Sequence, residues 1–429
     1  MKTTEYPRLH ETVYEEVLPN GLHIRVLPKK GFAKKYAFFA TDYGSVDTAF
    51  EIDGKWIRTP DGVAHYLEHK MFDMPDGSAD AAFARDGASP NAFTSYGMTA
   101  YYFNCTENFL PNLETLISFV STPYFTQRSV DKERGIIAQE IRMYEDNAES
   151  RVSENLFSAL YDHHPVRVPI AGSVESIGEI TPQTLYDCHR AFYDPSNMML
   201  CVMGDVDPEE VIRTARELLP ENPSGVSDRS YGENEILDRE PKTVRTQMDI
   251  SMPTFEVGFR CEAPERGENV MVAEIIGDMA AELLVGESSP LYTRLVEQGL
   301  IDPDFAAGFE RIKGVALLSA GGDSDAPEQV VEAILQEAER ICREGVDSAL
   351  FNRLKKSAIG RRTRDLDSFE SICYRMCAYF FDGADFLRFP EAYDAVNEQQ
   401  VQEFLRRVVR RERMALSVID PIKEDESIA

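Results

Sequence analysis

The first half of the chain contains several short apolar runs that are typical of strands. Residues 22–28 follow the turn Pro19-Asn20-Gly21 and alternate between apolar and polar side chains, as a half-buried strand does. Residues 35–41 are denser in apolar side chains, which is typical of a central strand. Residues 98–103 and 198–203 are rich in strand-forming side chains as well. These runs predict one sheet in this half.

Helical spacing of apolar residues separates these strands. It occurs at residues 79–83, 108–120 and 208–219, and a further helix is predicted to start after the turn at residues 59–62. The longest such segment, residues 129–144, opens with a serine that can cap a helix and with acidic residues in its first turn. Its apolar residues form one stripe, so we expect an amphipathic helix.

The pattern then breaks and restarts. Residues 220–242 are rich in Pro, Gly, Ser, Asp and Glu and show little periodicity, which is typical of an interdomain linker. Beyond them, residues 255–259 resemble the strand at 36–40, and residues 414–419 resemble the strand at 199–203. The spacing of roughly 210–220 residues indicates an internal duplication.

We therefore predict an α+β protein of two homologous domains. Residues 1–222 form the first domain, residues 223–243 the linker and residues 244–429 the second domain. Each domain is expected to be a mixed β-sheet flanked by helices. The two domains are expected to face one another around an enclosed, acidic chamber.

Composition and charge narrow the possible partners. With 43% hydrophobic and 28% charged residues in 429, the chain is an ordinary globular protein. Its net charge of −29 argues against nucleic acid as a partner, because phosphates would be repelled. An acidic interior would attract basic peptides, although a solvated acidic surface explains the same charge and is the simpler interpretation.

Nothing in the sequence indicates export or a membrane. Residues 1–18 are polar and charged, and no apolar run approaches the roughly 18 residues that a spanning helix needs. The seven cysteines are an odd, scattered set that is typical of buried thiols in a reducing compartment. We predict a cytoplasmic protein.

One short motif carries the candidate chemistry: His65-x-x-Glu68-His69. On a helix, positions four apart share a face, so His65 and His69 can hold one zinc ion. Glu68 then lies about 60° around the helix, close to a water on that ion. The alternative is a salt-bridged helix face with two surface histidines. The neighbouring residues are mostly apolar, however, and burying this motif would be costly unless it were paired or metal-bound.

A third ligand must come from elsewhere, because catalytic zinc usually has three protein ligands. Glu140 is the candidate, 71 residues beyond His69 on the helix at residues 129–144. Glu133 lies seven residues earlier, two turns away, and shares its face. Spacing alone favours a solvated helix face for both, a role that also suits Glu145, Asp146 and Glu149.

Residues 62–72 together with residues 131–150 resemble the inverzincin metallopeptidases, the pitrilysin, insulinase and mitochondrial processing peptidase family. The resemblance is detailed over the first 220 residues and covers the second half only in general pattern. It implies that His65, His69 and Glu140 bind Zn²⁺ and that Glu68 is the general base. It also implies that Glu133 orients a zinc ligand from outside the coordination sphere.

The same resemblance extends to a substrate strand. Residues 87–102 resemble the edge strand of the family, with its Asn-Ala-x-Thr core at Asn91, Ala92, Phe93 and Thr94. In that family a peptide substrate adds to this edge as an extra strand. These four residues are therefore implied to bind substrate.

Two features resemble a particular bacterial branch and imply a partner. The amino-acid sequences of residues 68–72 and 87–95 resemble those of a branch that occurs as paired subunits and is associated with elongation factor P modification. Active relatives also carry an Arg and a Tyr in the second half, in a segment matched here by residues 295–302. Val296 and Asp302 stand at those two positions. The resemblance thus implies a heterodimer in which a homologous subunit supplies the missing groups.

The expected function is a zinc metalloendopeptidase acting on peptides or unfolded segments, as the zinc-bearing half of a two-subunit enzyme. The intact Glu68 favours this interpretation. The alternative is a peptide-binding or scaffold subunit, without proteolysis of its own or dependent on a partner, in a translation-factor modification pathway. The missing Arg and Tyr favour that alternative for the isolated chain.

Overall fold

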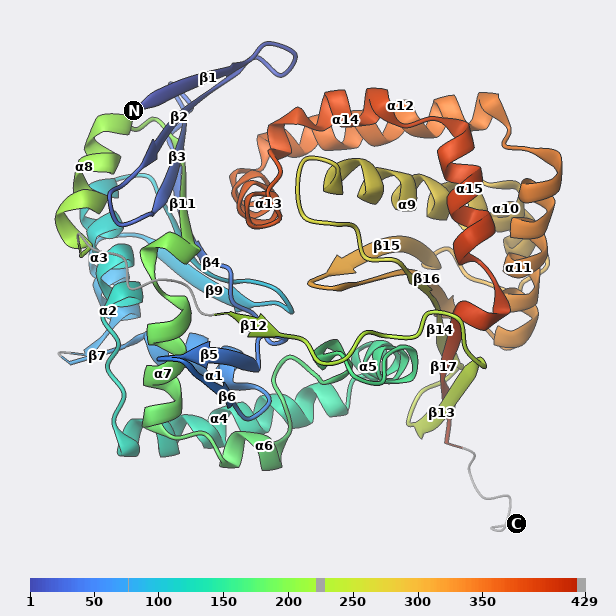
Figure 1. The fold of residues 1–429 in the computed structure, drawn as a ribbon, viewed down its shortest axis with the longest axis horizontal. Coiled ribbons are helices and arrows are strands. Elements are labelled where there is room, and N and C mark those ends of the chain that lie inside the picture. Colours follow the sequence, from blue (N-terminus) through green and yellow to red (C-terminus); the bar gives the residue numbers. More distant parts are fainter. Residues whose placement is uncertain (76, 221–227, 423–429) are drawn as a thin grey trace. The chain divides into compact units, whose positions relative to one another are not determined.

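The computed structural model describes residues 1–75, 77–220 and 228–422 (Figure 1). Their packing divides them into two compact units, each made of three segments of the chain. The first unit consists of residues 1–141, 169–231 and 362–388, as far as they are described, and the second consists of residues 142–168, 232–361 and 389–422.

A seven-stranded mixed sheet forms the centre of the first unit. Its strands are β1 (Lys2–Tyr6), β2 (Glu11–Val17), β3 (His23–Pro28), β4 (Lys35–Thr41), β9 (Ser89–Thr94), β10 (Thr99–Cys105) and β11 (Met198–Gly204). They lie in the order β1-β2-β3-β11-β4-β10-β9, and only the β3–β11 pair is parallel. Strands β4 and β11 are almost entirely buried, and for β4 this confirms the central strand predicted from its apolar density.

Helices cover both faces of this sheet (Figure 1). The helices of the first unit are α1 (Val63–Met71), α2 (Ala79–Arg85), α3 (Phe109–Ser121), most of α4 (Gln127–Glu145), α6 (Val174–Gly178), α7 (Pro182–Phe192), α8 (Pro208–Leu218) and α13 (Phe369–Phe381). In β4, Ala37 and Phe39 join the core beneath α1 and α3. Tyr36 and Phe38 point to the opposite face, which α13 covers.

Three short strands make a small second sheet beside the first. They are β5 (Ala49–Ile52), β6 (Lys55–Arg58) and β12 (Arg229–Ser230), in the order β12-β5-β6, and a two-strand ribbon joins β7 (Asp73–Met74) to β8 (Gly77–Ser78). Of the predicted linker at residues 223–243, residues 223–227 lie outside the described residues. Its later part includes β12, where Arg229 forms ion pairs with Asp42 and Asp47, at 3.0 and 3.6 Å. Residues 228–231 therefore belong to the first unit, whereas residues 232–243 belong to the second.

The second unit has a five-stranded sheet of β13 (Lys242–Met248), β14 (Thr254–Cys261), β15 (Ala306–Ile312), β16 (Val315–Asp323) and β17 (Met414–Pro421). Their order is β13-β17-β14-β16-β15. Its helices are α5 (Ala148–Leu160), α9 (Val270–Val285), α10 (Pro290–Glu297), α11 (Pro327–Glu344), most of α12 (Ser348–Arg364), α14 (Phe389–Ala395) and α15 (Glu398–Val408). Short 3-10 turns occur at Pro165–Arg167, Pro195–Asn197, Asp365–Asp367, Phe386–Arg388 and Arg411–Arg413.

The two sheets repeat one topology, which confirms the internal duplication and the α+β class. In the first unit β3-β11-β4-β10-β9 begins with a parallel pair and continues with antiparallel pairs. In the second unit β13-β17-β14-β16-β15 follows the same order with the same directions. Strands β1 and β2 extend only the first sheet.

The compact units depart from the predicted division of the chain at two helical segments. Helix α5 lies within residues 1–222 but packs on β13, β14 and β17 of the second unit. Helix α13 lies within residues 244–429 but packs on β4 and β11 of the first. The reason is burial, because each sheet has two apolar faces and the exchanged helix covers one of them. The ranges 1–222 and 244–429 stay a prediction about the repeats, and the enclosed chamber also stays a prediction.

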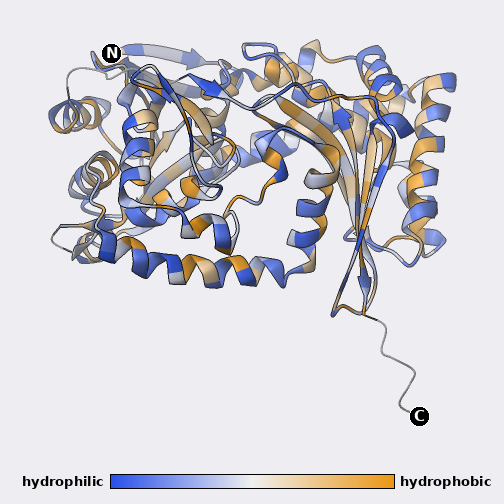
Figure 2. Cartoon of the chain, turned by 60° about the horizontal axis from the view of Figure 1, so that its bottom comes forward, coloured by the Kyte–Doolittle hydropathy of each residue, from blue (hydrophilic) through white to orange (hydrophobic). Residues whose placement is uncertain are grey.

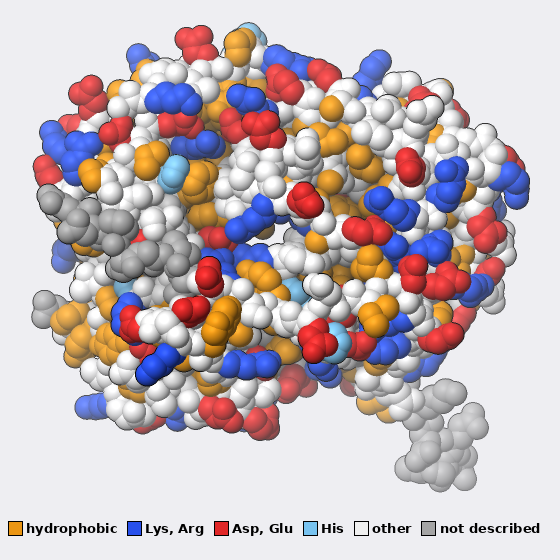
Figure 3. Space-filling model, in the orientation of Figure 1, with side chains coloured by type: hydrophobic (Ala, Val, Ile, Leu, Met, Phe, Trp, Pro, Cys, Tyr) orange, Lys and Arg blue, Asp and Glu red, His pale blue; other side chains and the backbone are white. Residues whose placement is uncertain are grey.

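Surface charge and hydropathy match an ordinary globular protein. Helices in Figure 2 carry both blue and orange residues, as amphipathic helices do. Acidic and basic side chains are interspersed on the face shown in Figure 3, which favours the solvated-surface explanation of the net charge. Among the described residues, no helix combines the length and apolar character needed to cross a bilayer. Six of the seven cysteines are buried and all seven are free thiols.

Gly62 sets the start of helix α1. It caps the helix with φ of 88°, and a Cβ built on it would lie 2.4 Å from the carbonyl oxygen of Ala171. Gly172 takes part in the same close approach of the two backbone segments: a Cβ built on it would lie 2.5 Å from the carbonyl oxygen of Asp61. Only glycine accepts both the left-handed backbone and this close approach.

We expect Gly62→Ala to lower the free energy of unfolding by roughly 2 kcal/mol or more, because the left-handed backbone alone costs about 1–2 kcal/mol. Thermal unfolding measures the change. Gly135→Ala is the matched control, because Gly135 is exposed within α4 and its Cβ would meet nothing within 4 Å. That control should stabilise the protein by up to about 1 kcal/mol. Equal unfolding midpoints for the two variants would contradict this account of the turn.

Candidate metal centre

Helix α1 is held against helix α4 with its polar residues at the contact. Tyr66 and Leu67 of α1 are completely buried in the core of the first unit. The Tyr66 hydroxyl donates a hydrogen bond to the carbonyl oxygen of Val130 in α4. This bond ties the two helices together, so residues on the neighbouring face of α1 meet the side chains of α4.

His65, His69 and Glu140 converge at this contact. One donor atom from each lies within 4.8 Å of the others, the arrangement that a single metal ion requires. The Nε2 atom of His65 lies 3.6 Å from Oε1 of Glu140, and Nε2 of His69 lies 3.4 Å from its Oε2. His65 is buried, while His69 and Glu140 are partly exposed. The structure thus brings together the three candidate ligands predicted from sequence, although Glu140 lies 71 residues beyond His69 in the chain.

Glu133 holds the outer side of His69. Its Oε1 lies 3.1 Å from His69 Nδ1, leaving Nε2 directed toward Glu140. Burial disfavours the charged imidazole, but the hydrogen bonds to Glu133 and Glu140 outweigh burial and raise the pKa of His69 to about 10. The hydrogen bond to His69 lowers the pKa of Glu133. The two carboxylates therefore favour positive charge at this position.

The donor set fits Zn²⁺. Two imidazole nitrogens and one carboxylate oxygen are typical ligands of catalytic zinc, and three protein ligands leave a position for water or substrate. An outer carboxylate on a ligand histidine, as Glu133 provides, is also typical of such sites. Glu145, Asp146 and Glu149 are exposed and lie outside the triad, in the solvated role predicted for them.

Glu68 lies beside the triad and is held by the edge strand. It is only 8% exposed, and burial raises the pKa of its carboxyl despite the nearby His65. Thr94 donates a hydrogen bond of 2.7 Å from Oγ1 to Glu68 Oε2. A buried carboxylate with a raised pKa has the properties of a general base.

Two buried tyrosines lie behind this carboxylate. The hydroxyls of Tyr101 and Tyr193 are 2.7 Å apart, and burial raises the pKa of each well above its usual value. Both phenols therefore stay neutral at physiological pH. The negative charge of Glu68 would repel a phenolate, so it raises the pKa of both tyrosines further.

Residues Asn91 to Thr94 form the end of β9, the last strand of the seven-stranded sheet. Among the described residues β9 pairs only with β10, so its other edge is open. Ala92 and Thr94 share the sheet face of Tyr101 and Thr99, toward α1, and Asn91 and Phe93 share the opposite face. The predicted edge strand is present, and it ends directly at Glu68.

The sequence did not predict the contact between Thr94 and Glu68. The family resemblance implies only a substrate-binding role for Thr94, and its separation of 26 positions from Glu68 gives no spacing signal. Only the pairing of β9 with β10 and the packing of α1 on them create it.

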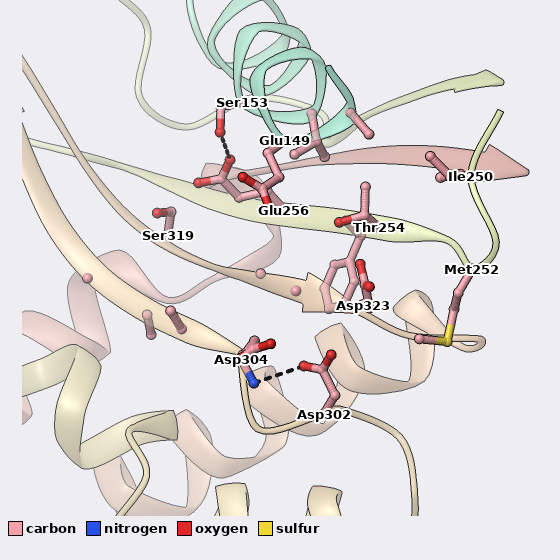
Figure 4. A pocket seen from close by; sticks show the side chains of 18 of the residues that line it. Glu149, Ser153, Ile250, Met252, Thr254, Glu256, Asp302, Asp304, Ser319 and Asp323 are labelled. Carbon is pink, nitrogen blue, oxygen red and sulfur yellow. Dashed lines mark hydrogen bonds between the residues drawn. The ribbon is translucent and has the colours of Figure 1, made fainter. Parts of the chain in front are cut away.

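A separate cavity of about 730 Å³ lies in the second unit (Figure 4). Its wall carries five carboxylates, and Ser153 donates a hydrogen bond of 2.7 Å to one of them, Glu256, whose pKa burial raises. The backbone N–H of Asp304 binds Asp302 at 3.1 Å. None of the predicted site residues lines this cavity, so it is distinct from the metal centre. The acidic lining residues are Glu149, Glu256, Asp302, Asp304 and Asp323.

Two models of known protein families match the chain. A family model described as Insulinase (Peptidase family M16) matches residues 58–174, which include both histidines and Glu140. A model described as Peptidase M16 inactive domain matches residues 179–358. The two matches cover most of both repeats, in chain order.

Individual relatives extend along the whole chain. The uncharacterized zinc protease YmfH of Bacillus subtilis is 38% identical over 432 residues, covering 98% of this chain and 99% of that protein. The crystal structure of an M16-like peptidase from Alicyclobacillus acidocaldarius is 32% identical with a TM-score of 0.91, covering 96% of this chain and 99% of that one. A protease from Helicobacter pylori, 19% identical with a TM-score of 0.80 and coverage of 95% and 99%, shows the fold alone.

From the geometry we expect one Zn²⁺ per chain, bound by the triad. His65→Ala, His69→Ala and Glu140→Gln should each abolish stoichiometric binding, because two remaining ligands hold zinc poorly. Glu133→Gln should weaken affinity by about 10–100-fold, the effect typical of removing an outer partner. Metal analysis and competition with a chelating dye measure both. Glu149→Gln, an exposed carboxylate nearby in sequence, is the control and should bind zinc normally; unchanged affinity in Glu140→Gln would contradict the assignment.

Proposed function

Because this chain belongs to peptidase family M16, the insulinase family, we propose that it is a zinc-dependent endopeptidase that hydrolyses peptides or unfolded segments. The observation that carries the proposal is the convergence of His65, His69 and Glu140, with Glu68 held beside them at an open sheet edge. These groups are the parts that metal-assisted amide hydrolysis needs.

Each residue of the site is proposed to have a separate role. His65, His69 and Glu140 hold the Zn²⁺, and Glu133 keeps His69 oriented through its 3.1 Å contact. When bound, the ion supplies Lewis-acid polarisation of the scissile carbonyl and lowers the pKa of water toward about 7. Glu68 takes a proton from the attacking water and returns it to the leaving amine. Its raised pKa suits both transfers, because the carboxylate then binds a proton more readily.

The substrate is proposed to bind as an extra strand along β9. Residues Asn91, Ala92, Phe93 and Thr94 offer the open edge of the sheet. Backbone hydrogen bonds to such an edge need an extended segment, which folded domains rarely expose. Peptides and unfolded segments therefore fit the site, and the net charge of −29 favours basic ones.

A homologous partner subunit is proposed to complete the enzyme. Active relatives carry an Arg and a Tyr at positions that hold Val296 and Asp302 in this chain. Val296 lies near the end of α10 and is 36% exposed, and Asp302 lines the acidic cavity of the second unit. Neither side chain can replace a cationic or phenolic donor. The chain is thus proposed as the zinc-bearing subunit of a cytoplasmic heterodimer.

The second candidate is a peptide-binding or scaffold subunit in a translation-factor modification pathway, dependent on a partner or without proteolysis of its own. The absence of the Arg and Tyr favours it for the isolated chain. The intact Glu68, held by Thr94, favours the enzyme instead.

We expect Glu68→Gln to keep zinc and to lose peptide hydrolysis by about 100-fold or more, because a general base typically contributes 10²- to 10⁴-fold. A quenched fluorescent peptide pool, with metal content measured in parallel, tests this. Removing zinc with a chelator should abolish turnover, and adding Zn²⁺ back should restore it. Background-level turnover in both proteins, with zinc bound, would favour the scaffold candidate.

The partner proposal makes a separate prediction about turnover. The highly purified chain alone should hydrolyse the peptide pool at least about tenfold more slowly than the chain co-purified with its partner, because transition-state charge stabilisation is worth that much or more. Mass spectrometry of the co-purified material should show a homologous chain carrying the Arg and Tyr. Equal activity of the chain alone and the complex would rule the partner requirement out.

A further inference from the structure

Thr94 lies where the edge strand meets the general base. It is the last residue of β9 and pairs with Thr99 of β10. Its hydroxyl carries one proton, and that proton is donated to Glu68 Oε2 at 2.7 Å. An ionised carboxylate is only an acceptor, so the direction of this bond is unambiguous when Glu68 is charged.

Thr99 of β10 restrains the position of the Thr94 hydroxyl. Thr99 is completely buried and donates to the carbonyl oxygen of Tyr43 at 2.9 Å. Its Oγ1 also lies 3.4 Å from Oγ1 of Thr94. Threonine has few χ1 rotamers because it is branched at Cβ, and the strand pairing sets the backbone. The position of the Thr94 oxygen is therefore determined by β10.

Among the described residues, no second hydrogen bond restrains the carboxylate of Glu68. The hydrogen bond from Thr94 engages only Oε2. The carboxylate belongs to a side chain with several rotatable bonds, and it must keep a narrow orientation to exchange protons with water. Fixing one oxygen leaves the other, Oε1, in a constant direction.

We propose that Thr94 is a positioning residue for the general base: its hydroxyl holds Oε2 of Glu68 so that Oε1 is the oxygen that exchanges the proton. This inference rests on the proposed peptidase function. It assigns to the Thr94 side chain a role other than contact with substrate. Because β9 is also the proposed substrate strand, one residue links the docking edge to the orientation of the base.

The test uses the full zinc-loaded chain together with the subunits that co-purify with it. Thr94→Val keeps the size and Cβ branching of threonine but removes the hydroxyl, whereas Thr94→Ser keeps the hydroxyl. We expect Thr94→Val to lower kcat by about 10–100-fold with KM within about twofold, because misorientation of a catalytic group costs rates of that order. Thr94→Ser should restore kcat to within about threefold of wild type. Zinc affinity should be equal in all three proteins.

A second readout does not depend on turnover. In crystal structures of the zinc-loaded wild type and Thr94→Ser, the Glu68 carboxylate should have one orientation, with Oε2 against the hydroxyl. In Thr94→Val it should rotate away or occupy several orientations. An unchanged, single orientation in Thr94→Val would overturn the proposal whatever the kinetics show.

The kinetic outcomes separate this inference from the function on which it rests. If Glu68→Gln is inactive while Thr94→Val turns over like wild type, only the positioning role fails. A change confined to KM would assign Thr94 to substrate binding and would likewise overturn the proposal. If Glu68→Gln turns over as fast as wild type, Glu68 is not the base, and both the proposed function and the role of Thr94 fail.

Discussion

The arrangement of the first unit depends on one requirement: the polar side chains buried on the short helix α1 need hydrogen-bonding or ionic partners. Helix α1 has nine residues, and nearly all of them are buried, among them His65 and Glu68. Imidazole and carboxylate groups are costly to bury unless they are paired. Their partners come from two other elements, with Glu133 and Glu140 on α4 and Thr94 on β9. The glycine turn at Gly62 and the bond from Tyr66 to α4 hold α1 where these partners meet.

The duplicated sheets show how one architecture supports different roles. Both units repeat the same order of five strands, and each has an edge strand that is open among the described residues, β9 in the first and β15 in the second. In the first unit the edge adjoins Glu68 and the histidines, whereas in the second β15 adjoins an acidic cavity without them. The topology is therefore shared, and the chemistry depends on side chains added to it. The exchanged helices α5 and α13 cover sheet faces that would otherwise remain apolar and exposed.

Local patterns in the sequence predicted much of the architecture and the candidate metal ligands. Apolar density identified β4 as a central strand, and the repeat spacing anticipated the matching pairs β4 with β14 and β11 with β17. The motif spacing placed His65 and His69 on one helix face, and a two-turn spacing joined Glu133 to Glu140. These signals are readable because they depend only on the 2.0- and 3.6-residue periods of strands and helices.

The sequence by itself determined the candidate groups: two imidazoles, the carboxylate of Glu68 and a distal pair of glutamates, within a duplicated α+β chain. Spacing alone favoured a solvated face for Glu140, and only the crossing of α1 and α4 brought its carboxylate within 3.6 Å of His65. Tertiary structure likewise decided that Thr94 contacts Glu68 and that α5 and α13 exchange between units. These contacts join residues far apart in the chain, and no local period records them, because they arise from burying apolar faces and pairing the polar groups buried with them.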